Sequence, residues 1–335
     1  MIRVAINGAG RIGRAFYKLA HTHKDIEVVA LNDLGDIENI AYLLKFDSVY
    51  GRSPFEIEVK DGNLVIDGKT IKFLSEKEPN KLPWKDLNID VVVESTGFFT
   101  EYEKAKLHLD AGAKRVVISA PGKGDESLGA IVLMGINEEK LKTCTVTSNG
   151  SCTTNAASPI VAIIEDALDI EKALLDTVHS YTASQSLVDG PNKKDWREGR
   201  AAAQNIVPSS TGAATSVTKA VEGVPFFDGI SVRVPTPAGS YVDLTFVTKK
   251  NTSKDEVNHI LKEAAGEARW QGIFTVSEEP LVPSDIIGST YASIADLEMT
   301  RVVGGNLVKV LAWYDNEMGY TSTLVDHVVK LGKTI

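Results

Sequence analysis

Cysteine is scarce in this sequence, whose 335 residues contain only Cys144 and Cys152. Two cysteines cannot build the disulfide framework that is typical of secreted proteins, so we expect a reducing compartment and a cytoplasmic location. Long apolar runs are also missing, and no segment approaches the roughly 20 apolar residues of a membrane span. Residues 1–6 are predicted to form a strand and lack the cationic start and long apolar core of a signal peptide. We therefore expect no membrane association.

An excess of positive charge is missing too. The chain has 36 lysines and arginines against 45 aspartates and glutamates, a net charge of -9. Non-specific binding to nucleic acid needs a basic surface, so no nucleic-acid partner is expected. The sequence has no internal repeat, no low-complexity tract and no cluster with metal-ligand spacing, so no metal site is expected either. What is present is an ordinary globular composition, 43% hydrophobic, in a chain long enough for two domains.

The first 21 residues have the pattern of a strand, a glycine turn and a helix. Gly8, Gly10 and Gly13 are spaced as G-x-G-x-x-G after an apolar run, and apolar residues then recur at helical spacing. Gly8 permits the tight turn, Gly10 lets the backbone approach a pyrophosphate, and Gly13 lets the helix pack close to the strand. The anion is expected at the N-terminus of this helix.

A second predicted strand, residues 26–31, ends at Asn32-Asp33. Asp33 lies 20 residues after Gly13, where a carboxylate binds the adenosine ribose hydroxyls of a dinucleotide. A carboxylate there repels a 2′-phosphate, so the sequence favours NAD over NADP. The alternative is that Asp33 is only a turn residue, which is less compatible with the strand–helix–strand pattern around it.

More strands are predicted at 91–97, 115–121, 129–134 and 144–148, with a helix at 101–109. Strands that alternate with helices form a mostly parallel, doubly wound α/β sheet of the Rossmann type. Ligands bind such sheets at the carboxyl ends of the strands. The Asp-Gly pairs at 61–62 and 67–68 flank a short apolar run and predict hairpin turns.

Cys152 lies between the predicted strand at 144–148 and a predicted helix that runs to about Leu168. At a helix N-terminus, free N–H groups and the helix dipole favour the nucleophilic thiolate. The alternative is a buried cysteine that behaves as a small hydrophobe. His179, at the polar end of a predicted strand over 173–182, could be its acid–base partner. The alternative for His179 is a surface histidine or a hydrogen-bonded core histidine.

Two further segments carry groups that suit phosphate. Residues 209–214 (Ser-Ser-Thr-Gly-Ala-Ala) offer hydroxyls and amides that could hold an anion, or could cap a helix. Arg233 lies in a predicted strand over 230–236, and its planar guanidinium suits phosphate, although a solvated cation is the alternative.

The second half is predicted to be an α+β domain with an antiparallel sheet. The strand over 230–236 is expected to pair with a strand over 241–247 across the turn at 237–239. A last strand is predicted at 307–314, with helices at 254–268 and 320–330.

Several motifs occur together, in the order found in one protein family. They are Asn7-Gly8-Ala9-Gly10-Arg11-Ile12-Gly13-Arg14, Asn32-Asp33, Ser151-Cys152-Thr153-Thr154-Asn155, His179-Ser180-Tyr181-Thr182, Ser210-Thr211-Gly212, Arg233-Val234-Pro235-Thr236 and Trp313-Tyr314-Asp315-Asn316-Glu317-Met318-Gly319-Tyr320. The chain resembles the phosphorylating glyceraldehyde-3-phosphate dehydrogenase family from end to end. The resemblance implies an NAD-binding domain of residues 1–151 and 316–335, a catalytic domain of residues 152–315, and a homotetramer with the loop at 184–205 at a subunit interface.

The resemblance also implies a reaction and a site. Cys152 attacks the aldehyde of glyceraldehyde 3-phosphate with His179 as base, hydride passes to NAD, and inorganic phosphate releases 1,3-bisphosphoglycerate from the resulting thioester. Thr182 and Arg233 match the residues that bind the substrate phosphate. The family's residues that bind the inorganic phosphate correspond to Ser151, Thr153, Thr211 and Gly212. Besides Gly10 and Gly13, the implied cofactor contacts are Gly8, Arg11, Ile12, Asp33, Ser95, Ser119, Asn316 and Tyr320.

Three alternatives stay open. Erythrose-4-phosphate dehydrogenase is a sister enzyme with the same cysteine and histidine, although residues 179–182 and 210–212 are more similar to the triose enzyme. A non-phosphorylating aldehyde dehydrogenase would let water attack the thioester. A protein of another class, a non-catalytic NAD-binding sensor, would need no reactive Cys152. The sequence also departs from the family at Gly150, where alanine is usual.

Overall fold

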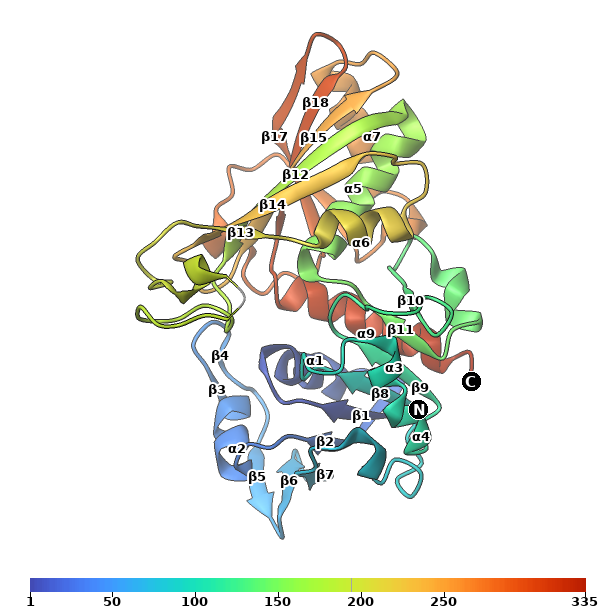
Figure 1. Cartoon of the computed structure of the whole chain (residues 1–335), viewed down its shortest axis with the longest axis vertical. Coiled ribbons are helices and arrows are strands. Elements are labelled where there is room, and N and C mark those ends of the chain that lie inside the picture. Colours follow the sequence, from blue (N-terminus) through green and yellow to red (C-terminus); the bar gives the residue numbers. More distant parts are fainter. Residues whose placement is uncertain (194) are drawn as a thin grey trace. The chain divides into compact units, whose positions relative to one another are not determined.

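The computed structural model describes residues 1–193 and 195–335 (Figure 1). The chain forms two compact units. Unit 1 contains residues 1–134, 138–150 and 321–335, and unit 2 contains residues 135–137 and 151–320. Within the described ranges, no helix has both the length and the apolar character needed to cross a membrane.

Unit 1 is built on a nine-stranded sheet in the order β10-β11-β9-β8-β1-β2-β7-β6-β5. Its strands are β1 (Ile2–Asn7), β2 (Ile26–Asn32), β5 (Ile57–Lys60), β6 (Asn63–Ile66), β7 (Lys69–Leu74), β8 (Val91–Glu94), β9 (Arg115–Ile118), β10 (Ala130–Ile131) and β11 (Val146–Ser148). The six pairs from β10 to β7 are parallel, and β5, β6 and β7 form antiparallel hairpins. The predicted Rossmann-type sheet is therefore confirmed, with an antiparallel extension at one edge.

The helices of unit 1 are α1 (Arg11–His21), α2 (Ile37–Lys45), α3 (Tyr102–Ala105), α4 (Leu107–Asp110) and most of α9 (Met318–Gly332). Short 3₁₀ turns occur at Pro79–Lys81 and Glu138–Lys142, and β3 (Phe46–Asp47) and β4 (Gly51–Arg52) form a two-stranded ribbon. The helix predicted at 101–109 is broken at Lys106, and the strand predicted at 129–134 is only two residues long. The first difference is an interruption inside the predicted helix, and the second is the early end of a strand, where boundaries are hardest to predict.

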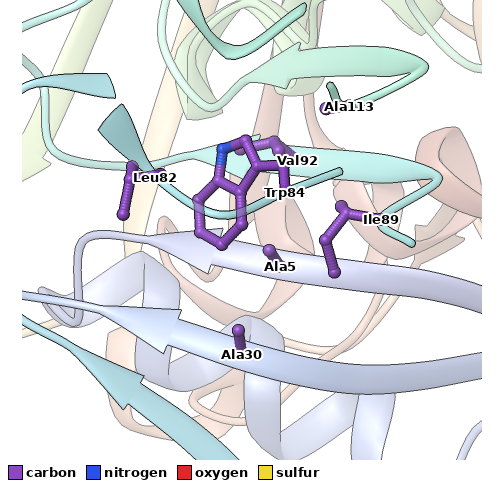
Figure 2. Packing of buried hydrophobic residues seen from close by; sticks show 7 residues of the cluster. All are labelled: Ala5, Ala30, Leu82, Trp84, Ile89, Val92 and Ala113. Carbon is purple, nitrogen blue, oxygen red and sulfur yellow. The ribbon is translucent and has the colours of Figure 1, made fainter. Parts of the chain in front are cut away.

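The core of unit 1 follows from the composition of its central strands. β8 is fully buried over all four residues, as expected for a parallel strand covered on both faces. One hydrophobic cluster surrounds the fully buried indole of Trp84, which packs against side chains that include Ala5, Ala30 and Val92 (Figure 2). The predicted hairpin turns are confirmed at Asp61-Gly62 and Asp67-Gly68, where all four residues have positive φ.

Unit 2 is built on a seven-stranded sheet in the order β13-β14-β12-β15-β18-β17-β16. Its strands are β12 (Ile170–Ser180), β13 (Val207–Ser210), β14 (Phe227–Val234), β15 (Ser240–Thr248), β16 (Phe274–Ser277), β17 (Ser293–Val303) and β18 (Leu307–Tyr314). Four of the six pairs are antiparallel, which agrees with the predicted α+β domain.

The helices of unit 2 are α5 (Cys152–Leu168), α6 (Ala213–Ala220), α7 (Lys254–Ala265) and α8 (Pro283–Ile286), with 3₁₀ turns at Trp196–Gly199 and Ala268–Trp270. Helix α5 contacts α6 and α7 and packs on the sheet along β12, β15, β17 and β18 (Figure 1). Helix α5 has seventeen residues, and the twelve from Thr153 to Ile164 are all buried, so α5 is the central helix of this unit.

The predicted hairpin of β14 with β15 is wrong, because β12 lies between them. β12 pairs in parallel with β14 and antiparallel with β15. This strand is eleven residues long. In a central position its backbone N–H and C=O groups form hydrogen bonds with a strand on each side, and its inward-facing side chains are buried. A hairpin turn can be read from local composition, but local composition does not reveal that a third strand separates the two arms.

Candidate active site

Cys152 is the first residue of α5. The helix is capped by the preceding residue, because Ser151 Oγ accepts a hydrogen bond of 3.0 Å from the Thr154 N–H. Gly150, just before the cap, has φ of 65°, a left-handed conformation that glycine adopts at little cost. The half-buried thiol therefore lies at the positive end of the helix dipole, as the sequence predicts.

His179 comes to the thiol from the end of β12. Its Nε2 lies 3.3 Å from Cys152 Sγ, although the two residues are 27 apart in the chain. Its Nδ1 lies 2.7 Å from the Ser180 carbonyl and 2.6 Å from Arg233 Nη1. Either tautomer satisfies Nδ1, which donates to the carbonyl when protonated and accepts from the guanidinium when it is not. When Nε2 accepts a proton, Nδ1 carries the other ring proton and donates to the Ser180 carbonyl, to which Arg233 Nη1 also donates.

Arg233 reaches this pair because of strand register. The parallel pairing of β12 with β14 sets His179 directly opposite Arg233, so their side chains share a face of the sheet. Besides its contact with His179, Arg233 Nη1 donates to the Ser180 carbonyl at 3.3 Å. The buried Arg233 Nε has no hydrogen-bond partner among the described residues. A buried guanidinium N–H without an acceptor suits an anionic ligand.

Burial dominates the electrostatics of the pair. Burial, reinforced by the Arg233 guanidinium, lowers the pKa of His179 to about 3, so the resting imidazole is neutral. Burial also raises the pKa of the Cys152 thiol, an effect that Arg233 and the backbone at the helix start oppose. Proton transfer from Sγ to Nε2 would create both ions at once, 3.3 Å apart, and their attraction would offset much of the cost of burying each.

Tyr314 belongs to this site although no role is predicted for it from the sequence. Its fully buried hydroxyl lies 2.9 Å from both Thr153 Oγ1 and Thr177 Oγ1, and its ring packs edge-on against His179. Tyr314 thereby ties the first turn of α5 to the strand that carries His179. The available signal was its position at the end of a long apolar strand, next to the Asp315-Asn316 segment.

The other predicted phosphate ligands lie in three places. Thr153 is held by Tyr314, and Ser151 Oγ lies 2.8 Å from Thr154 Oγ1. Thr182 follows β12 and contacts Ser184 Oγ at 3.1 Å. Thr211 and Gly212 precede α6, where Thr211 Oγ1 accepts from the Ala213 N–H at 3.2 Å. The N-cap residue of α6 is Gly212, which has no side-chain cap, so the capping alternative is not confirmed in its usual form, and a role in phosphate binding stays a prediction.

Asn316 is fixed by the turn before β15. Its Oδ1 accepts from Gly239 N at 3.1 Å and from Ser240 Oγ at 3.2 Å. Ser240 Oγ also accepts from the Ser180 N–H, so Asn316 is linked to the end of the strand that carries His179. Tyr320, also predicted to contact the cofactor, is buried in the first turn of α9.

A separate cavity of about 520 Å³ opens in unit 1, at the carboxyl ends of its parallel strands. Four predicted cofactor residues line it: Gly8, Gly10, Asp33 and Ser95. It is further lined by Asn7, Asn32, Leu34, Glu76, Lys77, Glu78, Thr96, Phe98 and Phe99. Its position at the sheet edge and its acidic residue at the end of β2 suit a dinucleotide.

Gly8 and Gly10, which line this cavity, and Gly13 of α1 have surroundings compatible with the roles predicted for them. A Cβ on Gly8, where φ is 102°, would lie 2.8 Å from the Ser95–Thr96 backbone, and one on Gly13 would lie 2.0 Å from the Gly8 carbonyl oxygen. A Cβ on Gly10 would meet nothing within 4 Å, so this exposed turn leaves space for a ligand. Close packing at two positions and open space at the third are what a pyrophosphate turn requires.

The remaining predicted cofactor residues of unit 1 do not line this cavity. Arg11 and Ile12 are half-buried in the first turn of α1, and Arg11 forms an ion pair of 2.8 Å with Asp47. Ser119 follows β9 and donates its N–H to the Glu94 carbonyl at 2.9 Å. No cluster of three or more possible metal ligands occurs within residues 1–193 and 195–335.

Comparison with known proteins gives a consistent result. Residues 2–102 match the family model of the glyceraldehyde 3-phosphate dehydrogenase NAD binding domain, and residues 151–316 match that of the C-terminal domain. The glyceraldehyde-3-phosphate dehydrogenase of Thermotoga maritima is 51% identical over 97% of this chain and 98% of its own length. That of Geobacillus stearothermophilus is 46% identical over 97% and 96% of the two chains. Glyceraldehyde-3-phosphate dehydrogenase 2 of Saccharomyces cerevisiae is 44% identical over 99% and 100%.

Proposed function

Since the chain belongs to the glyceraldehyde-3-phosphate dehydrogenase family, we propose that it oxidises glyceraldehyde 3-phosphate to 1,3-bisphosphoglycerate with NAD and inorganic phosphate. The observation that carries this proposal is the 3.3 Å contact of Cys152 Sγ with His179 Nε2 at the N-terminus of a helix. A thiol, a neutral base and a helix dipole at one point make a nucleophile that can attack an aldehyde.

In the first step, Cys152 forms a covalent bond with the aldehyde carbon. Sγ attacks as its proton passes to His179 Nε2, and the product is the alkoxide form of a thiohemiacetal on Cys152. Bound NAD supplies the hydride acceptor that converts this adduct to a thioester. His179 holds the transferred proton, and its Nδ1–H then donates to the Ser180 carbonyl.

In the second step, inorganic phosphate attacks the thioester carbonyl and Cys152 leaves as the thiolate. We assign the substrate phosphate to Thr182 and Arg233, whose buried Nε has an unused N–H. For the inorganic phosphate we propose Ser151, Thr153, Thr211 and Gly212. The starts of α5 and α6 support this assignment, because helix N-termini favour anions.

The cofactor is NAD, as the family match of residues 2–102 indicates. We propose that Asp33 holds its adenosine ribose and that the turn of Gly8, Gly10 and Gly13 holds its pyrophosphate, with Arg11, Ile12, Ser95 and Ser119 as further contacts. Asn316 is proposed to hold the nicotinamide amide and Tyr320 to bound the ring. The occupied Oδ1 of Asn316 supports its role, because it leaves Nδ2 as the donor that can face a ligand.

Three broader features are also proposals. The NAD-binding domain is residues 1–151 and 316–335 and the catalytic domain 152–315, which is close to the two compact units. The protein is a homotetramer, supported by exposed apolar side chains in the loop at 184–205, namely Leu187, Val188 and Trp196. Its location is the cytoplasm, supported by two cysteines that are both free thiols.

The substrate can be tested directly against that of the sister enzyme. With NAD and phosphate present, we expect NADH formation from glyceraldehyde 3-phosphate with kcat/KM at least about tenfold above that from erythrose 4-phosphate. Absorbance at the NADH band measures both rates on the same enzyme sample. A preference for the tetrose would instead assign the chain to erythrose-4-phosphate dehydrogenase.

A further inference from the structure

A buried polar network lies beneath the cavity of unit 1 and is not explained by packing alone. Its centre is Glu94, the last residue of β8, whose side chain is fully buried. Its Oε2 accepts from Asn7 Nδ2 at 2.6 Å and from His108 Nε2 at 3.0 Å. Its Oε1 accepts from the N–H and the hydroxyl of Thr96. Four donors thus occupy one buried carboxylate, which satisfies its lone pairs.

The protons of this network can be assigned from its geometry. The indole nitrogen of Trp84 can only donate, and it lies 2.9 Å from His108 Nδ1. His108 Nδ1 is therefore an acceptor, and the ring proton is on Nε2, where it points at Glu94. A second ring proton would oppose the indole N–H, so His108 is a neutral donor and Glu94 the anion. Figure 2 shows the indole among the buried side chains of its hydrophobic cluster.

The network continues along the carboxyl ends of neighbouring strands. Asn7 Oδ1 accepts from Asn32 Nδ2 at 2.7 Å. Asn32 also forms two hydrogen bonds of 2.9 Å with the backbone of Glu76: its Nδ2 donates to the carbonyl, and its Oδ1 accepts from the N–H. The Glu76 backbone, with one donor and one acceptor, thus fixes the orientation of the Asn32 amide. The Glu94 carboxylate, which only accepts, fixes that of the Asn7 amide.

Four members of this network line the cavity: Asn7, Asn32, Glu76 and Thr96. Glu94 bonds directly to two of them, Asn7 and Thr96, which lie at the ends of adjacent strands β1 and β8. His108 itself does not line the cavity. It reaches the cavity wall through its hydrogen bond to Glu94, and its ring also lies edge-on to Phe99 and 3.4 Å from Asn7 Nδ2, two residues of that wall.

We propose that His108 is a positioning residue for the cofactor: by donating to Glu94, it fixes the carboxylate that holds Asn7 and Thr96 in the shape that binds NAD. The inference rests on the proposed function only in taking NAD as the ligand of this cavity. Trp84 fixes the ring, but the contact that matters for the cofactor is the one from His108 Nε2 to Glu94.

Two substitutions separate the contacts of His108. In His108→Gln the amide nitrogen reaches the place of Nε2 and keeps the donor to Glu94, but the acceptor for Trp84 is lost. In His108→Asn the amide oxygen takes the place of Nδ1 and keeps the acceptor for Trp84, but the donor to Glu94 is lost. Each leaves one buried group unsatisfied, so both should lower the melting temperature to a similar degree.

Calorimetric titration of the full chain with NAD tests the proposal. We expect the Kd for NAD to rise at least tenfold in His108→Asn and less than threefold in His108→Gln. In steady-state assays the change in His108→Asn should appear in KM for NAD rather than in kcat. Equal weakening in the two variants, or unchanged binding in His108→Asn, would overturn the proposal, because both results are those of a purely structural residue.

Trp84→Phe keeps the test decisive if His108→Asn does not fold. It removes the indole donor and keeps the contact of His108 with Glu94, so the Kd for NAD should stay within threefold although the melting temperature falls. A larger loss in Trp84→Phe or in His108→Gln would overturn the proposal. If the parent chain did not bind NAD at all, the proposed function would fail instead, independently of how the variants compare.

Discussion

Replacing Cys152 with serine should lower kcat for glyceraldehyde 3-phosphate by about 10⁴-fold or more, the scale seen when a covalent nucleophile is removed. A serine hydroxyl at the start of α5 has the same place but a much higher pKa, and His179 with its lowered pKa is too weak a base to ionise it. The measurement is the steady-state rate of NADH formation at saturating NAD, substrate and phosphate. Alkylation by iodoacetamide should be lost in the same variant.

Cys144→Ser is the matched control, because it makes the same substitution at the other free cysteine of the chain. Cys144 is half-buried in unit 1 and is not among the residues proposed for the site, so both turnover and alkylation should persist. Slow alkylation of the parent chain, with no difference between the two variants, would favour a non-catalytic NAD-binding protein.

Replacing His179 with asparagine should lower kcat/KM by about 100-fold or more, the usual contribution of a general base. Asparagine is too short to place an acceptor at the position of Nε2, 3.3 Å from Sγ, so the thiol must ionise without a partner. The measurement is the rate of NADH formation, and His259→Asn is the control at an exposed histidine. An equal rate in His179→Asn and His259→Asn would refute the role of His179 as base.

The pH dependence of alkylation follows from the same two groups. Because the pKa of His179 is lowered to about 3, its ring stays neutral above about pH 4, and no loss of reactivity from its protonation is expected between pH 5 and 7. Because burial raises the pKa of the Cys152 thiol, the rate should increase as the pH rises. In His179→Asn the rate should be lower at each pH in this range, since Nε2 is no longer there to accept the thiol proton.

The parts of the fold that could be predicted are those specified by nearby residues. The glycine turn between β1 and α1, the two Asp-Gly hairpins and the start of α5 at Cys152 each depend on a few consecutive residues. The order of strands in unit 2 does not, because β12 enters between β14 and β15 through pairing over long distances in sequence. No local pattern records which of several apolar strands becomes central.

The same distinction holds for the site. Cys152 could be singled out by its place between a strand and a helix, and Arg233 by its charge in an apolar strand. Their contact with His179 depends on the register of β12 with β14, which only the folded sheet fixes. Glu94 and Trp84 could not be singled out, since the histidine that both contact lies in another element of the chain.

The most direct test of the account is the phosphate requirement of turnover, measured by stopped-flow absorbance of NADH. Without phosphate, the parent chain with NAD and glyceraldehyde 3-phosphate should release a burst of about one NADH per Cys152 and then nearly stop, because the thioester awaits its acceptor. Adding phosphate should restore steady turnover. Sustained turnover without phosphate and no acceleration on its addition would contradict the account and indicate hydrolysis of the thioester by water.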